Sequence, residues 1–243
     1  MSWLAVWLIG TACADLTHSA RPVRRLPGVV GAAAALGAGL LAGLHTGLDL
    51  AVVLLLAALV VAWDALVRHG FGARRVAVPL LLWGATGGVL VLSAGAAAPV
   101  GGLVERWQDA SPFTAVAGLD PDLLLLGLGV VLVQLSTANV LVRLVLTGTG
   151  TVNPTRRDAS QTLKGGRLLG PMERLLILGL GLAGQLTAAG LVVAAKGLLR
   201  WPEIQSSRDR EDGPGVDELT EYFLLGSFVS WLCALGGLLL LTV

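Results

Sequence analysis

Three polar side chains recur eleven residues apart in an apolar stretch near the C-terminal end of the sequence. They are Arg174, Gln185 and Lys196. A helix turns by about 100° per residue, so eleven residues return to within about 20° of the starting direction. If residues 172–198 form one helix, the three side chains share a face. Such a stripe in a membrane helix could hold an anionic ligand or could bind neighbouring helices together.

A second polar face is predicted in the preceding apolar segment. Ser136, Asn139 and Arg143 stand at i, i+3 and i+7 along it. Gln185 sits at the centre of its predicted helix and cannot reach the headgroups, so we expect it to bond across to another helix, with Asn139 nearest in depth. The basic residues of both faces stand near helix ends, where they can either snorkel or point inward.

Glycines and basic residues precede the predicted helix 172–198. Lys164 and Arg167 come first, Pro171 suits a first helical turn, and Glu173 follows. The N-terminus of a helix attracts phosphate, which could come from a lipid headgroup or a soluble ligand. The same basic residues could instead only satisfy membrane topology.

We therefore predict a polar seam between the C-terminal helices. Its candidate ligand-binding residues are Asn139, Arg143, Arg167, Glu173, Arg174, Gln185, Lys196 and Glu221. The favoured function is binding or passage of a small anionic or lipidic ligand. One alternative is a membrane enzyme acting on a lipid phosphate, with Glu173 or Glu221 as general base. The other is a structural or oligomerising scaffold.

The composition is that of an integral membrane protein. Of the 243 residues, 55% are hydrophobic and only 14% are charged, with a mean hydropathy of +0.79. A net charge of +1 without a basic face argues against nucleic-acid binding. Cys13 and Cys233 lie in apolar segments without metal-binding spacing, and Asp15 and Asp64 have no histidines at ligand spacing. We expect no metal and no cofactor.

The apolar segments predict an all-α, polytopic membrane domain that covers residues 1–243. About seven helices are expected, or six with a re-entrant first segment, at 3–18, 28–47, 49–67, 76–98, 123–146, 172–198 and 219–242. Basic residues between them place the N-terminus outside and the basic loop 148–171 in the cytoplasm, as in a bacterial inner-membrane protein. The charged loop 199–218 then falls outside despite its three arginines.

Glycines four residues apart mark one candidate contact face. Gly39, Gly43 and Gly47 have the spacing that lets two membrane helices approach closely. We expect membrane lipids as partners, and a homo-oligomer through this face is a further hypothesis.

The C-terminal third resembles a bacterial membrane family, domain of unknown function 3307, over about 80 residues. The matching positions are Gly166, Arg167, Gly170, Glu173, Arg174, Gln185, Lys196, Arg200, Glu221, Tyr222 and Gly226. The first half of that family is richer in histidine and aspartate pairs, which resemble those of metal-dependent hydrolases. This chain keeps Asp15 and Asp64 without the histidines, so the resemblance implies no activity here.

Overall fold

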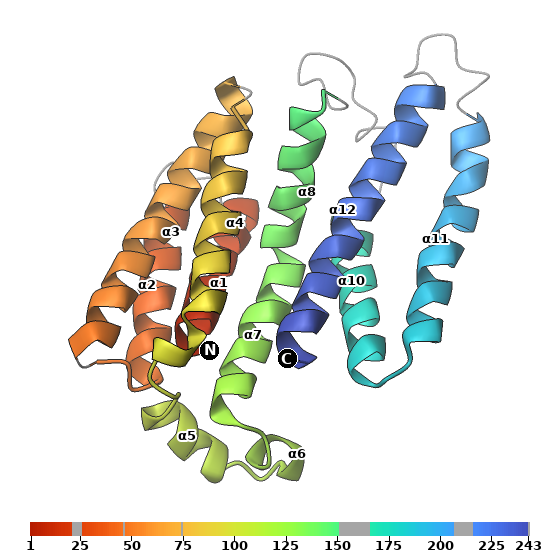
Figure 1. Cartoon of the computed structure of the whole chain (residues 1–243). Helices are drawn as coiled ribbons and strands as arrows, with labels where there is room; N and C mark the ends of the chain where they lie inside the picture. Colours follow the sequence, from red (N-terminus) through yellow and green to blue (C-terminus); the bar gives the residue numbers. More distant parts are fainter. Residues whose placement is uncertain (21–25, 46, 74, 151–165, 207–215, 243) are drawn as a thin grey trace. The chain divides into compact units, whose positions relative to one another are not determined.

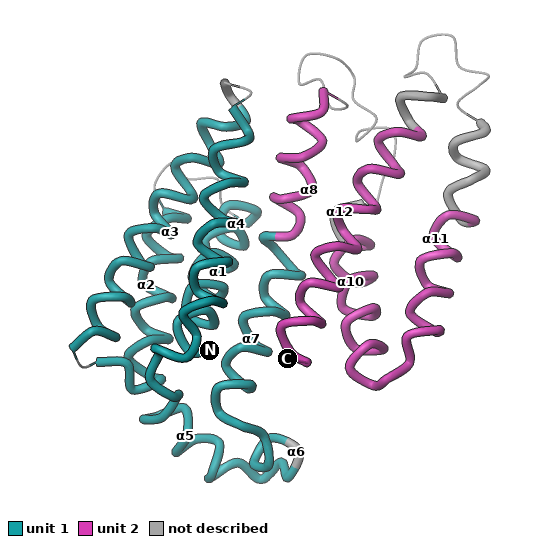
Figure 2. The backbone as a smooth tube through the Cα atoms, viewed as in Figure 1, with its two compact units in different colours: residues 1–137 teal, residues 138–243 magenta. Residues whose placement is uncertain are grey.

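The computed structural model describes residues 1–20, 26–45, 47–73, 75–150, 166–206 and 216–242. The chain divides into two compact units, Met1–Thr137 and Ala138–Val243 (Figure 2). The sequence alone predicts a single membrane domain without this division. Each unit is described by itself below.

Unit 1 is a helical bundle in which α1 is the central helix. All of the first eleven residues of α1 are among its thirteen buried positions, and α1 packs against α2, α3 and α7. The helices are α1 (Ser2–Ala20), α2 (Leu26–Leu41), α3 (Gly47–Ala73), α4 (Ala77–Leu92), the 3-10 turn η1 (Ala94–Ala96), α5 (Gly102–Asp109), α6 (Thr114–Ala117) and α7 (Pro121–Leu135). Figure 1 shows α5 and α6 beyond the ends of the longer helices.

Unit 2 is also helical. Its elements are α8 (Thr137–Gly148), whose first residue belongs to unit 1, α10 (Gly166–Leu182), α11 (Leu186–Ser206) and α12 (Val216–Thr242). Ile177, Ala189 and Ala234 form a small core where α10, α11 and α12 meet. Every regular element within the described ranges of both units is helical, as the sequence predicts.

Among the described residues, two helices are long and apolar enough to cross a membrane, at Gly47–Phe71 and Thr220–Thr242. A third span results if α7 and α8 are taken together across their break. Leu26–Leu41, Ala77–Leu92 and Leu186–Leu198 are apolar but shorter than the roughly 20 residues that a full crossing needs. These helices indicate a membrane protein, and the seven crossings expected from the sequence are not confirmed.

Close backbone contact joins α1 to α2 in unit 1. A Cβ atom at Gly31 would lie 2.6 Å from the carbonyl oxygen of Gly10, which is too close for any side chain. Between α1 and α4, the rings of Trp7 and Trp83 lie 5.2 Å apart. Small residues thus let α1 and α2 approach closely, and an aromatic pair packs α1 against α4.

The predicted single helix 172–198 is wrong, because the chain turns back at Ala183–Gln185 (Figure 1). Gly184 has a positive φ of 73°. The N–H of Gln185 donates to the carbonyl of Leu180 at 2.8 Å, and the N–H of Gly184 donates to that of Gly181 at 3.0 Å. This pair of bonds is a Schellman motif, which ends a helix at a left-handed glycine. Arg174 and Lys196 therefore stand on two helices of a hairpin.

The same motif ends α2 and separates the three glycines that were expected on one face. Gly43 has a φ of 80° and donates to Leu40, while Leu44 donates to Gly39. Gly47 starts α3 with a φ of 45°. A Cβ at Gly39 would lie 2.8 Å from Val53, so Gly39 serves packing within the chain. The single-face arrangement is wrong, and association of two copies stays a prediction.

The predicted helix 123–146 is interrupted at Ser136, between α7 and α8. The Ser136 hydroxyl donates to the carbonyl of Leu132 at 2.8 Å, a local bond that competes with regular helix geometry. Ser136 therefore does not continue the face that carries Asn139 and Arg143.

Candidate functional site

The C-terminal helices bring six side chains together in what we call the unit 2 polar cluster. Its members are Asn139, Glu173, Arg174, Lys196, Ser230 and Trp231. They come from α8, α10, α11 and α12, so each helix in the described part of unit 2 contributes.

Arg174 is the most deeply buried member of the cluster, with 1% of its surface exposed. Its Nη2 donates to Oδ1 of Asn139 at 2.7 Å. Its Nη1 donates to the Ser230 hydroxyl at 3.0 Å. The guanidinium group thus ties α10 to α8 and α12. Gly170, one turn earlier on α10, lies beside it, and a Cβ there would be in ordinary contact with Nη1, at 3.5 Å.

Glu173 forms the second half of the cluster. Its Oε2 accepts from Nζ of Lys196 at 2.5 Å, and its Oε1 accepts from the indole N–H of Trp231 at 2.8 Å. The Lys196 ammonium also lies 6.0 Å from the centre of the Phe223 ring, a distance at which a cation is attracted to an aromatic face. Glu173 therefore joins both arms of the hairpin to α12.

Burial decreases from one end of the cluster to the other. Arg174 is 1% exposed, whereas the side chains of Glu173 and Lys196 are 9% and 25% exposed. The charges of these three residues sum to +1 when all are ionised. The cluster is therefore a net cationic group that reaches the surface of the unit at Lys196.

Four of the eight predicted site residues meet in this cluster, namely Asn139, Glu173, Arg174 and Lys196. Gln185 does not, because it lies exposed in the hairpin turn. Arg143 and Glu221 are on exposed surfaces of α8 and α12. The expected pairing of Gln185 with Asn139 is wrong, since Gln185 lies exposed in the turn and Arg174 donates to the amide oxygen of Asn139.

The predicted phosphate site at a helix start also differs from the structure. α10 begins at Gly166, so Pro171 lies inside the helix and Glu173 stands two turns from its N-terminus. Arg167 is in the first turn of α10, and Lys164 lies outside the described residues. The buried guanidinium of Arg174 is engaged by two neutral side chains rather than placed at a helix end.

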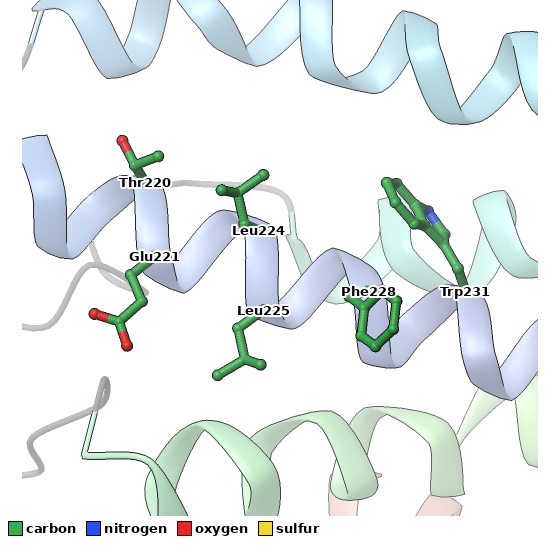
Figure 3. Close-up of a pocket in the computed structure, with 6 residues that line it drawn as sticks. All are labelled: Thr220, Glu221, Leu224, Leu225, Phe228 and Trp231. Atoms are coloured by element: carbon green, nitrogen blue, oxygen red, sulfur yellow. The ribbon is translucent and has the colours of Figure 1, made fainter.

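A shallow, open groove runs along α12 toward the cluster. It is lined by Thr220, Glu221, Leu224, Leu225, Phe228 and Trp231. Figure 3 shows Thr220, Leu224 and Trp231 projecting toward α11, with Glu221, Leu225 and Phe228 on the other side of α12. Because Trp231 donates to Glu173, the mostly apolar groove ends at the polar cluster.

Sequence reasoning missed two members of the cluster, Ser230 and Trp231. They are neighbours in α12, and Ser227 and Ser230 are both buried, at 4% exposure each. Two serines three residues apart within an apolar helix share a face, and this spacing could have marked the side of α12 that meets polar partners.

A separate polar group lies in unit 1 around two buried aspartates. The Asp64 carboxylate accepts from the backbone N–H of Gly28 at 3.1 Å and pairs with Arg68, one turn later on α3. Both Asp15 oxygens accept from the Trp63 indole, at 3.2 and 3.3 Å. Asp64 therefore caps the start of α2 from a neighbouring helix, because Gly28 is in the first turn, where N–H groups have no helical acceptor.

The described residues contain no group of three or more His, Cys, Asp or Glu side chains that could hold a metal ion. In comparisons with known proteins, no family model, no curated protein and no solved structure matches the chain. The resemblance of the C-terminal third to domain of unknown function 3307 stays a prediction.

Proposed function

We propose that unit 2 binds an anionic, lipidic ligand, with the acidic headgroup near Lys196 and the apolar part along α12. The observation that carries this proposal is the continuity between a net cationic cluster and an apolar groove, which meet at Trp231. An amphipathic anion offers both an acidic group and a hydrocarbon chain. Lys196 is the charged member with most exposed surface, so it is the residue that such a ligand contacts first.

The hairpin supports a revised membrane topology. A hairpin returns the chain to the side from which it came, whether or not its short arms cross the bilayer. Residues 199–218 then share the cytoplasmic side with residues 148–171, and the arginines at 200, 208 and 210 agree with the excess of basic residues expected there. With the N-terminus outside, α12 crosses outward.

Binding of this ligand is tested by native mass spectrometry of the detergent-purified protein, with analysis of the lipids that dissociate from it. We expect an anionic lipid to remain bound to the unchanged protein and to Lys196→Arg, which keeps the charge. Lys196→Met should lose it. Arg106→Gln is the matched control, because Arg106 is an exposed cation on α5 in unit 1 and should leave retention unchanged. Equal retention in Lys196→Met would exclude this binding site.

A structural role is the second candidate, and one specific observation favours it. Both carboxylate oxygens of Glu173 are already engaged within the chain, by Lys196 and Trp231. A cluster whose groups satisfy one another holds helices together. The same engagement counts against Glu173 as the general base of a lipid-phosphate enzyme. Loss of folded protein in both Lys196→Met and Lys196→Arg would favour the structural role.

A further inference from the structure

The connector between α4 and α7 carries a small apolar surface that the described residues of unit 1 leave exposed. On α5, Leu103 is 57% exposed and Trp107 is 60% exposed, and Phe113, just before α6, is 67% exposed. Large apolar side chains exposed outside a helical bundle commonly mark an interaction site.

The connector is held firmly to unit 1, so its exposed residues have a defined direction. The side-chain amide of Gln108, 2% exposed, donates to the carbonyls of Val116 and Leu119. Just before α5, the N–H of Val100 donates to Asp122 at 2.9 Å, and the N–H of Gly101 donates to the Ala42 carbonyl at 2.9 Å. These bonds fix α5 against the α2–α3 turn and the start of α7.

The exposed surface of α5 is divided into an apolar side and a charged side. Leu103 and Trp107 are four residues apart and point within about 40° of one another. Glu105 and Asp109 have the same spacing, and both are exposed. Around the axis of α5, the mean direction of the apolar pair and that of the charged pair differ by about 160°. Buried Gln108 occupies the direction between them, on the side toward the protein.

This arrangement is that of a short helix at a membrane surface. Helices in the headgroup region turn Trp and Leu toward the hydrocarbon and charged residues toward water. Trp is enriched at this depth because its ring is apolar and its N–H is polar. The connector joins two apolar helices, α4 and α7, at their ends, which places it at the depth of the headgroups if these helices enter the bilayer (Figure 1).

We propose that α5 is an interfacial anchor, which inserts Leu103 and Trp107 into the lipid headgroup region and keeps Glu105 and Asp109 in water. The proposal is independent of ligand binding in unit 2. A second protein is a poorer occupant, because a two-residue face is far smaller than the roughly 800 Å² per partner of a stable interface.

Nitroxide labels on the full chain in phosphatidylcholine vesicles test this proposal. In a Cys13→Ala, Cys233→Ala background, single labels are placed by Leu103→Cys, Trp107→Cys, Glu105→Cys and Asp109→Cys. Relaxation by oxygen reports lipid, and relaxation by a water-soluble nickel complex reports water. We expect the ratio of oxygen to nickel accessibility to be several-fold higher at 103 and 107 than at 105 and 109.

Equal, high nickel accessibility at all four positions would overturn the anchor, and so would exclusion of both reagents at 103 and 107, which indicates a protein contact. A second measurement uses the fluorescence of Trp107 in the unchanged protein, so that α5 carries no label. The contribution of Trp107 is the fluorescence that is lost in Trp107→Phe, and lipids brominated near the glycerol backbone should quench it. An unquenched Trp107 signal would also contradict the proposal.

Discussion

Replacement of Glu173 by glutamine tests the energetic importance of the unit 2 polar cluster. In Glu173→Gln, the amide oxygen can still accept from Trp231, but the amide nitrogen meets the Lys196 ammonium, so a donor faces a donor. Breaking a fully buried ion pair costs about 3–5 kcal/mol, whereas an exposed pair contributes about 0–1 kcal/mol. Because Lys196 is one-quarter exposed, at 25%, we expect a loss of about 2 kcal/mol in the free energy of unfolding.

A double-mutant cycle separates this pair from general damage. Lys196→Met alone leaves a carboxylate of 9% exposure without its cation, and the double variant removes both charges. We expect a coupling energy of about 1–2 kcal/mol, measured by reversible denaturation in mixed micelles. Pairing Glu173→Gln with Arg106→Met in unit 1 is the control cycle and should show no coupling. A coupling energy below about 0.5 kcal/mol between Glu173 and Lys196 would refute the reasoning.

Three further substitutions test local features, each with a control; the two glycine substitutions are tested by the free energy of unfolding and the aspartate by hydrogen exchange. Gly184→Ala should destabilise unit 2 by about 1 kcal/mol because Gly184 has a φ of 73°. The control Gly179→Ala, in open space on α10, should be neutral or stabilising. If both substitutions stabilised the protein, α10 and α11 would form one continuous helix. Gly31→Ala should lower the free energy of unfolding by about 1–3 kcal/mol, because the new Cβ clashes with Gly10. In the control Gly37→Ala, the new Cβ meets no atom within 4 Å and should be tolerated. An equal effect of the two substitutions would contradict the close α1–α2 contact. Asp64→Asn should speed hydrogen exchange in the first turn of α2, because the charged acceptor of the Gly28 N–H is lost. Unchanged exchange at Gly28 would show that Asp64 does not cap α2, and Asp109→Asn, an exposed carboxylate on α5, is the control for loss of a carboxylate.

The helices of the first half could be predicted because polar residues separate their apolar runs. Arg21 to Arg25 follow α1, and Arg74 and Arg75 follow α3. The end of α2 is different, since it depends on the left-handed conformation of Gly43 rather than on a polar residue. Several glycines precede Gly43 in the same helix, so composition alone did not show which glycine ends it.

The hairpin in unit 2 was missed for the same physical reason. Gly184 follows Gly179 and Gly181 in an unbroken apolar run, and Gln185 is the only polar residue at the turn. A polar residue in an apolar stretch predicts a mid-membrane contact, whereas Gln185 is an exposed turn residue. The sequence leaves open whether Lys196 snorkels or points inward, and it pairs Asn139 with Gln185. In the structure Lys196 bonds to Glu173 and Asn139 bonds to Arg174, partners that only the tertiary structure brings near.

The most direct test of the central claim asks on which side of the membrane residues 149 and 206 lie. In a Cys13→Ala, Cys233→Ala background, Thr149→Cys and Ser206→Cys are labelled with an impermeant maleimide in intact and in lysed spheroplasts. A hairpin formed by α10 and α11 predicts that both positions react alike, and only after lysis. Reaction of the cysteine at 206 in intact cells, with protection at 149, would show a single crossing between them and would contradict the hairpin.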